Sequence, residues 1–458
     1  RLVRSTDIRG AVPEPLSANV AWRIGHAAAQ FFRSKLKGYD RADPRARSIV
    51  TASDMRSSSA SIHAAMVHGV RAAGVLAIDI GAVDAPQLCF AVRHLGAGGG
   101  ILTTGGRSPE AYSGFKLCGA GGRDVATATG LADIRDIAAR VPQHDTGTMA
   151  GRREADLSDA YRTFVRAHLP SSLARPLTLV ADAGGGVMGR WMSTVFSGIE
   201  GLTLVTLHDR AEEPFPHDPN PTSPRALGDL RRAVKSHRAD IGVCFDPDGD
   251  GCVFVDERGT MIRPDLAAAL AARRALERSK GGVVVVDHGF GRAAEEEILR
   301  AGGTVQREPP DAAHVRKTMA ETQAVFGATL SGQFFFRENG CCESGMLAVT
   351  TMLGVAAAAT RRLSEVVRPL ARYRMSDAHR MASDDPAAAL ARAAQHFGEE
   401  WSGGTDLFVR RDEWWLHAAT QAGRAEVSVR VEAVNAEMMR EKLVEAKAVL
   451  EGKRTPAT

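Results

Sequence analysis

The segment IGVCFDPDGDGCVFV, residues 241–255, places a dense acidic loop between two short apolar runs. The flanking runs, Ile241–Phe245 and Cys252–Val255, are typical of buried strands. Between them, Asp246, Asp248 and Asp250 alternate with proline and glycine, so the loop can curl and bring three carboxylates onto one hard divalent cation. We therefore expect a Mg²⁺ loop between two strands, with a solvated acidic turn as the alternative.

Two further sequence motifs in this part of the chain have weaker support. The acidic loop also has EF-hand spacing, with Gly251 sixth and Glu257 twelfth, but an EF-hand needs a helix on each side. The pattern G-x-G-x-x-G at residues 184–189 follows the apolar run Leu177–Ala181 and precedes Asp209, as in a dinucleotide fingerprint. Two residues separate that run from the first glycine, so we favour a tight strand-to-helix turn.

Working outward, strand and helix patterns alternate along most of the chain. Short β-branched runs such as Val283–Val286 follow longer Ala/Leu/Arg stretches such as Asp265–Ser279. Similar strand-to-glycine starts near residues 48, 177 and 282 indicate three α/β units. The last part differs, because a strand at Glu426–Glu432 precedes a helix at Ala436–Leu450, which predicts a smaller α+β domain.

Composition excludes several classes of protein. The 458 residues carry 58 basic and 54 acidic side chains, a net charge of +4 that does not favour nucleic-acid binding. No apolar run reaches the roughly 18 residues of a membrane span. The six cysteines form no C-x-x-C pair, which fits a reducing, cytoplasmic compartment. We interpret the adjacent Cys341 and Cys342 as buried small apolar residues, with a redox role as the alternative.

The segment TTGGRSPEAYSGFK, residues 103–116, is the other candidate for chemistry. Its glycines and hydroxyl residues, with Arg107 and Lys116 nearby, suit a loop that cradles a phosphate. Ser108 is a candidate nucleophile. From spacing alone, an ordinary surface loop fits equally well.

Taken together, these segments resemble the α-D-phosphohexomutases, the phosphoglucomutase and phosphomannomutase family, and they do so in the family's order. The resemblance implies three related mixed-sheet α/β domains and a C-terminal α+β domain around a central cleft, which we place at residues 1–152, 153–258, 259–370 and 371–458. The motifs that carry it are Asp7-Ile-Arg9-Gly10, Asp54-x-Arg56-x-Ser58, Pro109-Glu-Ala-Tyr112-Ser-Gly114-Phe-Lys116, Asp182–Gly189, Pro219-Asn-Pro221, Asp246–Asp250 and Ser331-Gly332-Gln333-Phe-Phe-Phe336.

The resemblance also implies a reaction, in which a phosphoserine passes its phosphate to a hexose 1- or 6-phosphate beside Mg²⁺. Alignment on Pro109 and Lys116 puts Gly106 at the phosphoserine position, and glycine has no side chain to phosphorylate. Arg107 stands where the family has histidine. Ser108 lies two residues away, so its Cα is up to about 7 Å from the required place. Attack needs reacting atoms about 3–3.5 Å apart.

Other differences from the family motifs also lie at residues that would support phosphoryl transfer or bind phosphate. Gly251 replaces an arginine that would support the phosphoserine. In the C-terminal domain, the segment ATQAGRA at residues 419–425 replaces R-x-S-x-T-E-P. Losing about three charge-assisted hydrogen bonds, at roughly 1.5–3 kcal/mol each, removes on the order of 5–9 kcal/mol of phosphate binding. In the third domain, the residues that replace family positions are Gly289, Asp311-Ala312, Thr329 and Gln333. In the last domain, the residues that could still donate to a phosphate are Thr420, Gln421 and Arg424.

The residues that shape the fold match the family, whereas those that would carry its reaction differ. We therefore predict a pseudoenzyme of the family that binds a metal, a hexose phosphate or a protein partner. The alternative is an active phosphomannomutase or phosphoglucomutase with a rearranged nucleophile such as Ser108, or the equally displaced Thr104. A third hypothesis is a structural subunit of an active homologue. The candidate substrate-binding residues are Arg9, Lys116, Ser331, Gln333 and Arg424, and the candidate cofactor is Mg²⁺ on Asp246, Asp248 and Asp250.

Overall fold

The computed structural model describes residues 2–36, 42–142, 149–170, 172–420 and 424–453. The chain divides into two compact units, one formed by Arg1–Asp287 with Ile298–Val367 and the other by His288–Glu297 with Arg368–Thr458. Within the described residues, no helix combines the length and the apolar character that crossing a bilayer requires.

The first sheet of the larger unit is mixed and has the order β1-β5-β4-β2-β3-β6. Strand β2 pairs in parallel with β3 and β4, whereas β5 runs antiparallel to β4 and β1. The elements are β1 (Ile8–Ala11), α1 (Ala18–Lys35), β2 (Ser48–Ser53), α2 (Ser59–Ala72), β3 (Leu76–Ala82), α3 (Ala85–Leu95), β4 (Gly99–Thr103), β5 (Tyr112–Gly119), α4 (Leu131–Arg140) and β6 (Arg152–Glu154).

Local sequence sets the ends of these elements. Asp84 begins α3 because its carboxylate accepts a 2.7 Å hydrogen bond from the backbone N–H of Gln87, and Gly96 ends the helix with φ +64°. Helices α1 and α2 approach closely at Gly25, where a Cβ would lie 2.1 Å from the carbonyl oxygen of Met66. Every residue of β4 is buried, so the loop after it starts from a rigid base.

The second sheet has the order β10-β9-β7-β8, with β7 parallel to both β8 and β9. Strands β9 and β10 form the antiparallel hairpin predicted around the acidic loop, with Phe245 opposite Cys252. The elements are α5 (Ser158–Arg166), β7 (Leu177–Asp182), α6 (Met188–Phe196), β8 (Leu202–Leu207), α7 (Gly228–Ser236), β9 (Ile241–Phe245) and β10 (Cys252–Asp256).

The third sheet has the order β12-β11-β13-β14-β15, parallel around β11 and antiparallel from β13 onward. Its core includes the fully buried aromatic strand β14. The elements are α8 (Pro264–Ser279), β11 (Gly282–Asp287), α9 (Arg292–Arg300), β12 (Gly303–Glu308), α10 (Ala312–Thr322), β13 (Phe326–Ala328), β14 (Phe334–Phe336), β15 (Cys342–Glu343), α11 (Gly345–Ala358) and α12 (Leu363–Val367).

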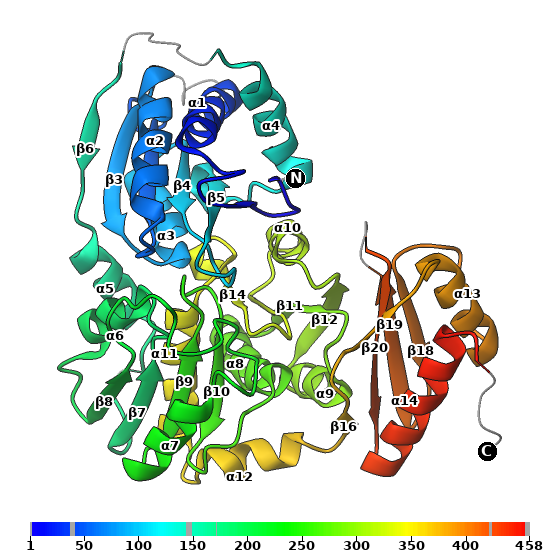
Figure 1. The fold of residues 1–458 in the computed structure, drawn as a ribbon. Helices are drawn as coiled ribbons and strands as arrows, with labels where there is room; N and C mark the ends of the chain where they lie inside the picture. Colours follow the sequence, from blue (N-terminus) through cyan, green and yellow to red (C-terminus); the bar gives the residue numbers. More distant parts are fainter. Residues whose placement is uncertain (1, 37–41, 143–148, 171, 421–423, 454–458) are drawn as a thin grey trace. The chain divides into compact units, whose positions relative to one another are not determined.

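The smaller unit contains an antiparallel sheet with the order β16-β20-β19-β18, to which β17 adds by pairing with β20. Helices α13 and α14 cover one face of this sheet (Figure 1) and share a hydrophobic core with it. The elements are β16 (Arg374–Met375), β17 (His379–Ala382), α13 (Pro386–Phe397), β18 (Asp406–Arg410), β19 (Trp414–Thr420), β20 (Glu426–Ala433) and α14 (Ala436–Leu450).

These observations confirm the predicted fold class of three mixed α/β domains followed by a smaller domain with an antiparallel sheet. The helix predicted at Ala436–Leu450 has those same bounds, and the one predicted at Asp265–Ser279 begins one residue earlier. The domain boundaries proposed from the sequence stay predictions.

Candidate functional site

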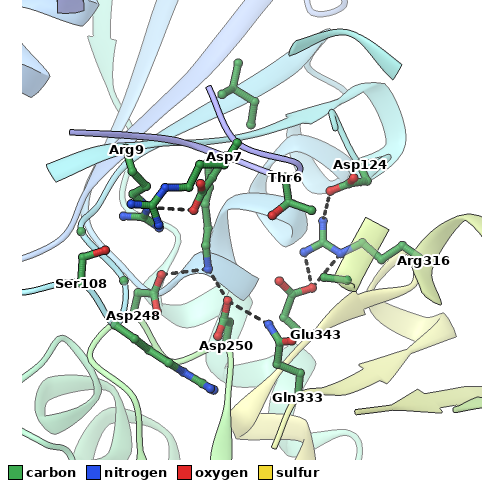
Figure 2. A pocket seen from close by; sticks show the side chains of 17 residues that line it. Thr6, Asp7, Arg9, Ser108, Asp124, Asp248, Asp250, Arg316, Gln333 and Glu343 are labelled. Atoms are coloured by element: carbon green, nitrogen blue, oxygen red, sulfur yellow. Dashed lines mark hydrogen bonds and ion pairs between the residues drawn. The ribbon is translucent and has the colours of Figure 1, made fainter. Parts of the chain in front are cut away.

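The larger unit contains a pocket of about 370 Å³ that is lined by residues from all three of its sheets (Figure 2). The pocket collects five basic and five acidic side chains, so its formal charges balance. These side chains are Arg4, Arg9, Arg107, Lys116, Arg316, Asp7, Asp124, Asp248, Asp250 and Glu343.

The acidic loop, residues Asp246–Gly251, closes the β9–β10 hairpin at one wall of this pocket. Its backbone is tied by a 3.1 Å hydrogen bond from the N–H of Asp246 to the carbonyl of Gly251. Asp246, Asp248 and Asp250 are all buried, and each offers an oxygen within 4.8 Å of the other two. Sequence spacing therefore correctly predicted that these three carboxylates converge.

Cationic side chains meet each of these carboxylates. The Nε of Arg107 lies 2.9 Å from Oδ2 of Asp246. The Nζ of Lys116 lies 2.9 Å from Oδ2 of Asp248 and also pairs with Asp250. Lys116 is itself held by the backbone of β5, which places its side chain across the loop.

These contacts decide which carboxyls stay ionised. Burial raises the pKa of Asp246 well above its ordinary value, and the charge of Asp250 adds to this, although Arg107 opposes both. Burial also disfavours ionisation of Asp250, but Lys116, Asp246 and Arg107 together outweigh it and lower the pKa of that carboxyl. Burial disfavours the charged form of Lys116 too, yet Asp248 and Asp250 together raise its pKa.

The donor chemistry of the acidic loop fits a hard divalent cation, because three carboxylate oxygens are the ligands that Mg²⁺ prefers. A bound cation would have to displace Lys116 and Arg107 from the oxygens they now contact. The arrangement is thus able to hold a metal, but it already supplies positive charge of its own.

In the loop that faces the acidic loop, Thr103–Ser108, a side chain at either glycine would require a neighbouring arginine to move. A Cβ at Gly105 would lie 2.2 Å from Cζ of Arg56. Gly106 has φ +53°, which favours glycine, and a Cβ there would lie 2.8 Å from Nη2 of Arg9. Two arginines therefore occupy the space that larger residues would need.

Arg56 also fixes the path of this loop. Its guanidinium donates to the carbonyls of Gly106 at 2.6 Å, Ser108 at 2.9 Å, Pro109 at 2.8 Å and Tyr112 at 3.0 Å. The arginine is fully buried and pairs with Asp54 at 3.4 Å. The D-x-R motif that the sequence analysis used only for recognition thus holds the loop in shape.

Two hydroxyl groups flank the glycines. The Oγ1 of the buried Thr104 lies 3.5 Å from Oδ2 of Asp248 and accepts a 3.0 Å hydrogen bond from the N–H of Gly106. Ser108 lines the pocket, and its N–H donates to the carbonyl of Gly105 at 3.1 Å. Thr104 is therefore nearer to the acidic loop than its displaced sequence position suggested.

Arg107 occupies the space that Gly251 leaves. A Cβ at position 251 would lie 2.1 Å from Nη2 of Arg107. The resemblance places an arginine at position 251 and a histidine at position 107, so this chain has an arginine on the opposite loop instead. Arg107 therefore fills the space beside Gly251 and supplies the positive charge that faces Asp246.

The remaining predicted residues divide between the two units. Arg9 lines the pocket, contacts Asp7 at 2.7 Å and donates to the carbonyl of Thr104. Gln333 also lines it, with its amide 3.5 Å from Oδ2 of Asp250. Ser331 contacts Gln333 at 3.3 Å without lining the pocket. Arg424 belongs to the smaller unit, where it pairs with Glu426, and Gln421 lies outside the described residues.

Sequence reasoning missed Arg316, the side chain that links two sheets at the far side of the pocket. Arg316 from α10 lies 2.9 Å from Asp124 and also pairs with Glu343 (Figure 2). Burial and the Arg316 charge act in opposite directions on Glu343, whose pKa is raised, mainly by burial. No motif marks these three residues, although Ala312 in the same helix occupies an aligned position that lines the pocket.

The chain matches both family models and individual known proteins. Models of phosphoglucomutase/phosphomannomutase α/β/α domains I, II and III match residues 1–145, 159–259 and 263–373. A phosphomannomutase of Salmonella montevideo is 31% identical over 405 residues, which cover 87% of this chain and 86% of the relative. A protein of Xanthomonas campestris named for phosphohexose mutases is 30% identical over 401 residues, with 87% and 86% covered.

Solved structures agree with this fold. A phosphoglucomutase/phosphomannomutase family protein from Burkholderia thailandensis superposes with a TM-score of 0.85 at 24% identity, covering 100% of this chain and 99% of the other. An N-acetylphosphoglucosamine mutase of Aspergillus fumigatus, solved with GlcNAc-6P and magnesium, gives a TM-score of 0.58 at 12% identity, with 95% and 97% covered.

Proposed function

Since this chain belongs to the phosphoglucomutase/phosphomannomutase family, we propose that it binds hexose phosphates without transferring a phosphoryl group. The observation that carries the proposal is Gly106. The family's reaction needs a hydroxyl at this position, and here a side chain would have to adopt a left-handed backbone of φ +53° and displace the guanidinium of Arg9. The predicted pseudoenzyme is therefore our leading function.

The neighbouring hydroxyls do not replace the missing carrier. The loop would have to shift to bring Ser108 to position 106, and Arg56 holds the loop through its carbonyl contacts at Gly106 and Ser108. Thr104 is buried beneath the glycines, so a sugar phosphate cannot reach its oxygen without the loop opening. Near-attack geometry is lost when reacting atoms are displaced by about 1 Å or more.

Binding of a hexose phosphate has support in the size and the donors of the pocket. A volume of about 370 Å³ is in the range of small-molecule sites. Arg4, Arg9, Lys116 and Arg316 line it as donors to a phosphate. The balancing carboxylates weaken the attraction for an anion, so we expect modest affinity. Mg²⁺, held by Asp246, Asp248 and Asp250, would add positive charge on the side where a phosphate binds.

The test is a coupled mutase assay on glucose 1-phosphate and mannose 1-phosphate, with Mg²⁺ and the matching 1,6-bisphosphate. We expect no turnover from the wild type. A calorimetric titration of the same protein with glucose 6-phosphate is expected to show binding that weakens in Lys116→Met. Turnover that disappears in Asp248→Ala would overturn the proposal.

The second candidate is an active phosphomannomutase or phosphoglucomutase with a relocated carrier. Thr104 is a candidate for this carrier because its hydroxyl lies 3.5 Å from Asp248. Ser108 is the other candidate because it lines the pocket. Incorporation of labelled phosphate from glucose 1,6-bisphosphate distinguishes the two, because Thr104→Val and Ser108→Ala remove one hydroxyl each. If neither the wild type nor these variants incorporate label, this candidate is wrong.

The proposed domain boundaries and the association with an active homologue or another protein stay separate predictions. Limited proteolysis checks the boundaries at residues 152, 258 and 370. Co-purification with a tagged copy of the chain checks the association.

A further inference from the structure

Outside the pocket, the second sheet gathers four metal-binding side chains at one edge. Asp182 ends β7 and lies opposite Cys244 of β9 in the parallel pairing. His208 directly follows β8, whose last residue pairs with Asp182. His217 comes from the loop beyond. The carboxyl ends of parallel strands meet at the same edge of a sheet, which is where ligands bind in such folds.

The ligand atoms of Asp182, His217 and Cys244 are spaced as in a candidate metal site, and His208 adjoins this group through Asp182. The Nε2 of His217 lies 3.2 Å and the Nδ1 of His208 lies 3.7 Å from Oδ1 of Asp182. The ligand atoms of Asp182, His217 and Cys244 all lie within 4.8 Å of one another. In a tetrahedral zinc site with bonds of about 2.0–2.2 Å, neighbouring nitrogen and oxygen ligands are roughly 3.3–3.6 Å apart.

Both histidines are oriented as metal ligands are. Each directs one ring nitrogen at Asp182, and its other nitrogen has a fixed acceptor. For His208 that acceptor is Oδ2 of Asp229 at 3.2 Å, and for His217 it is the carbonyl of Asp218 at 3.0 Å. Histidines bound to metals almost always donate their second N–H to a carboxylate or a backbone carbonyl.

Unpaired polar atoms point to a missing ligand. Asp182 is fully buried, and its Oδ1 is satisfied by the N–H of Gly184 at 3.0 Å. Its Oδ2 and the Nδ1 of His208 have no hydrogen-bond partner among the described residues. Such groups are costly, and an ion is one of the few ordinary explanations for them. His208 moreover holds a left-handed φ of +47°, a conformation kept only where the surroundings require it.

A second His–Asp–His group in the smaller unit offers the contrast. There Oδ1 of Asp406 contacts His417 at 2.8 Å and His288 at 3.3 Å, while Oδ2 accepts from Thr405 at 2.7 Å. Both carboxylate oxygens are therefore satisfied by protein groups. Hydrogen bonds within the protein account for this group, so it serves as a matched control for the candidate metal site.

We propose that Asp182, His217 and Cys244 bind Zn²⁺ at a site separate from the acidic loop, and that His208 moves in from its place beside Asp182 as the fourth ligand. A set of two imidazoles, one thiolate and one carboxylate suits zinc, whereas Mg²⁺ prefers oxygen ligands alone. On binding, the thiol proton of Cys244 leaves to solvent and the sulfur–zinc bond forms. Four protein ligands leave no open position, so the metal has a structural role, joining the ends of β7, β8 and β9.

The test uses the full chain after removal of metals, titrated with Zn²⁺ against a competing chelator. We expect one equivalent to bind, and His208→Asn, which retains a residue tolerant of the left-handed backbone, to lower affinity more than tenfold. Asp229→Ala, which removes only the acceptor behind His208, is expected to lower affinity by about tenfold to a hundredfold. A purely hydrogen-bonded cluster would show neither effect.

Cobalt substitution tests the thiolate. The Co²⁺ form of the wild type is expected to show a sulfur-to-cobalt charge-transfer band that Cys244→Ser loses while its visible d–d bands remain. His417→Asn is the control and is expected to bind like the wild type, with circular dichroism verifying the fold of each variant. The absence of stoichiometric zinc overturns the proposal, as does zinc binding that His417→Asn abolishes and His208→Asn leaves intact.

Discussion

The two loops that face each other in the pocket have diverged differently. The acidic loop Asp246–Gly251 keeps three converging carboxylates, whereas the opposite loop Thr103–Ser108 has glycines where a carrier would stand and Arg107 where a histidine would stand. Arg107 reaches across to Asp246, and Lys116 reaches Asp248. The three buried carboxylates are thus held by cationic partners from outside their own loop, because a buried charge needs a partner.

The largest effect is expected from Lys116→Met, which removes the lysine of β5 that pairs with two carboxylates of the acidic loop. Removing one partner of a buried ion pair leaves uncompensated charge on Asp248 and Asp250, which costs about 3–5 kcal/mol of unfolding free energy. Urea denaturation without divalent ions measures the loss, and added Mg²⁺ is expected to restore part of it.

An exposed pair gives the matched control for that experiment. Lys35 lies 3.9 Å from Asp133, with side chains 60% and 62% exposed, so Lys35→Met should change stability by less than about 0.5 kcal/mol. Equal stability of Lys116→Met and the wild type would show that the acidic loop does not depend on its lysine.

The next effect concerns Asp84, which lies behind the acidic loop without an ion-pair partner in the described part of the chain. The N–H of Ala85 donates to the carbonyl of Asp248 at 2.9 Å, which ties the two segments together. Burial raises the pKa of Asp84 to about 7, and hydrogen bonds from Gln87 and Tyr161 only partly oppose it. In the folded protein Asp84 therefore stays protonated below about pH 7.

The sign of the pH effect follows from proton binding. Between about pH 4 and 7 the folded state keeps the Asp84 proton that the unfolded chain releases, so this group lowers unfolding free energy as pH rises. Asp84→Asn lacks this effect. We expect the stability of the wild type relative to Asp84→Asn to fall by up to about 4 kcal/mol from pH 4 to pH 8 in urea denaturation. Parallel profiles for the two proteins would contradict the raised pKa.

The smallest effect is expected for metal affinity in Arg107→Ala. A charge-assisted hydrogen bond contributes about 1.5–3 kcal/mol, so freeing Asp246 from Arg107 should strengthen Mg²⁺ binding by about tenfold to a hundredfold. Calorimetric titration of the full chain measures it. Arg4→Ala removes the same charge from the pocket wall without breaking a contact to the loop, so an equal gain there would mean that overall charge, and not this ion pair, controls affinity.

The sequence predicted what depends on local pattern. Alternation and glycine placement located the hairpin around the acidic loop and the helix at Ala436–Leu450, because strand and helix periods are visible within a few residues. Resemblance to a family located Gly106. The contacts of Arg107 and Lys116 were not predictable, because they depend on which loops the fold brings together.

The proposed zinc site shows the same limit more sharply. The sequence analysis treated Asp182 only as part of a glycine turn and had no reason to group it with His208, His217 and Cys244. These residues meet because three parallel strands end at one edge, a property of sheet order rather than of spacing. Arg316, whose partners Asp124 and Glu343 come from different sheets, was missed for the same reason.

The packing of Arg56 has an evolutionary consequence. Any residue other than glycine at position 105 collides with this arginine, whose Cζ lies 2.2 Å from the required Cβ. Replacing Arg56 instead releases the carbonyls of Gly106 and Ser108 that it holds. Gly105 and Arg56 are therefore expected to be retained together in relatives that share this loop, since changing either one first lowers stability.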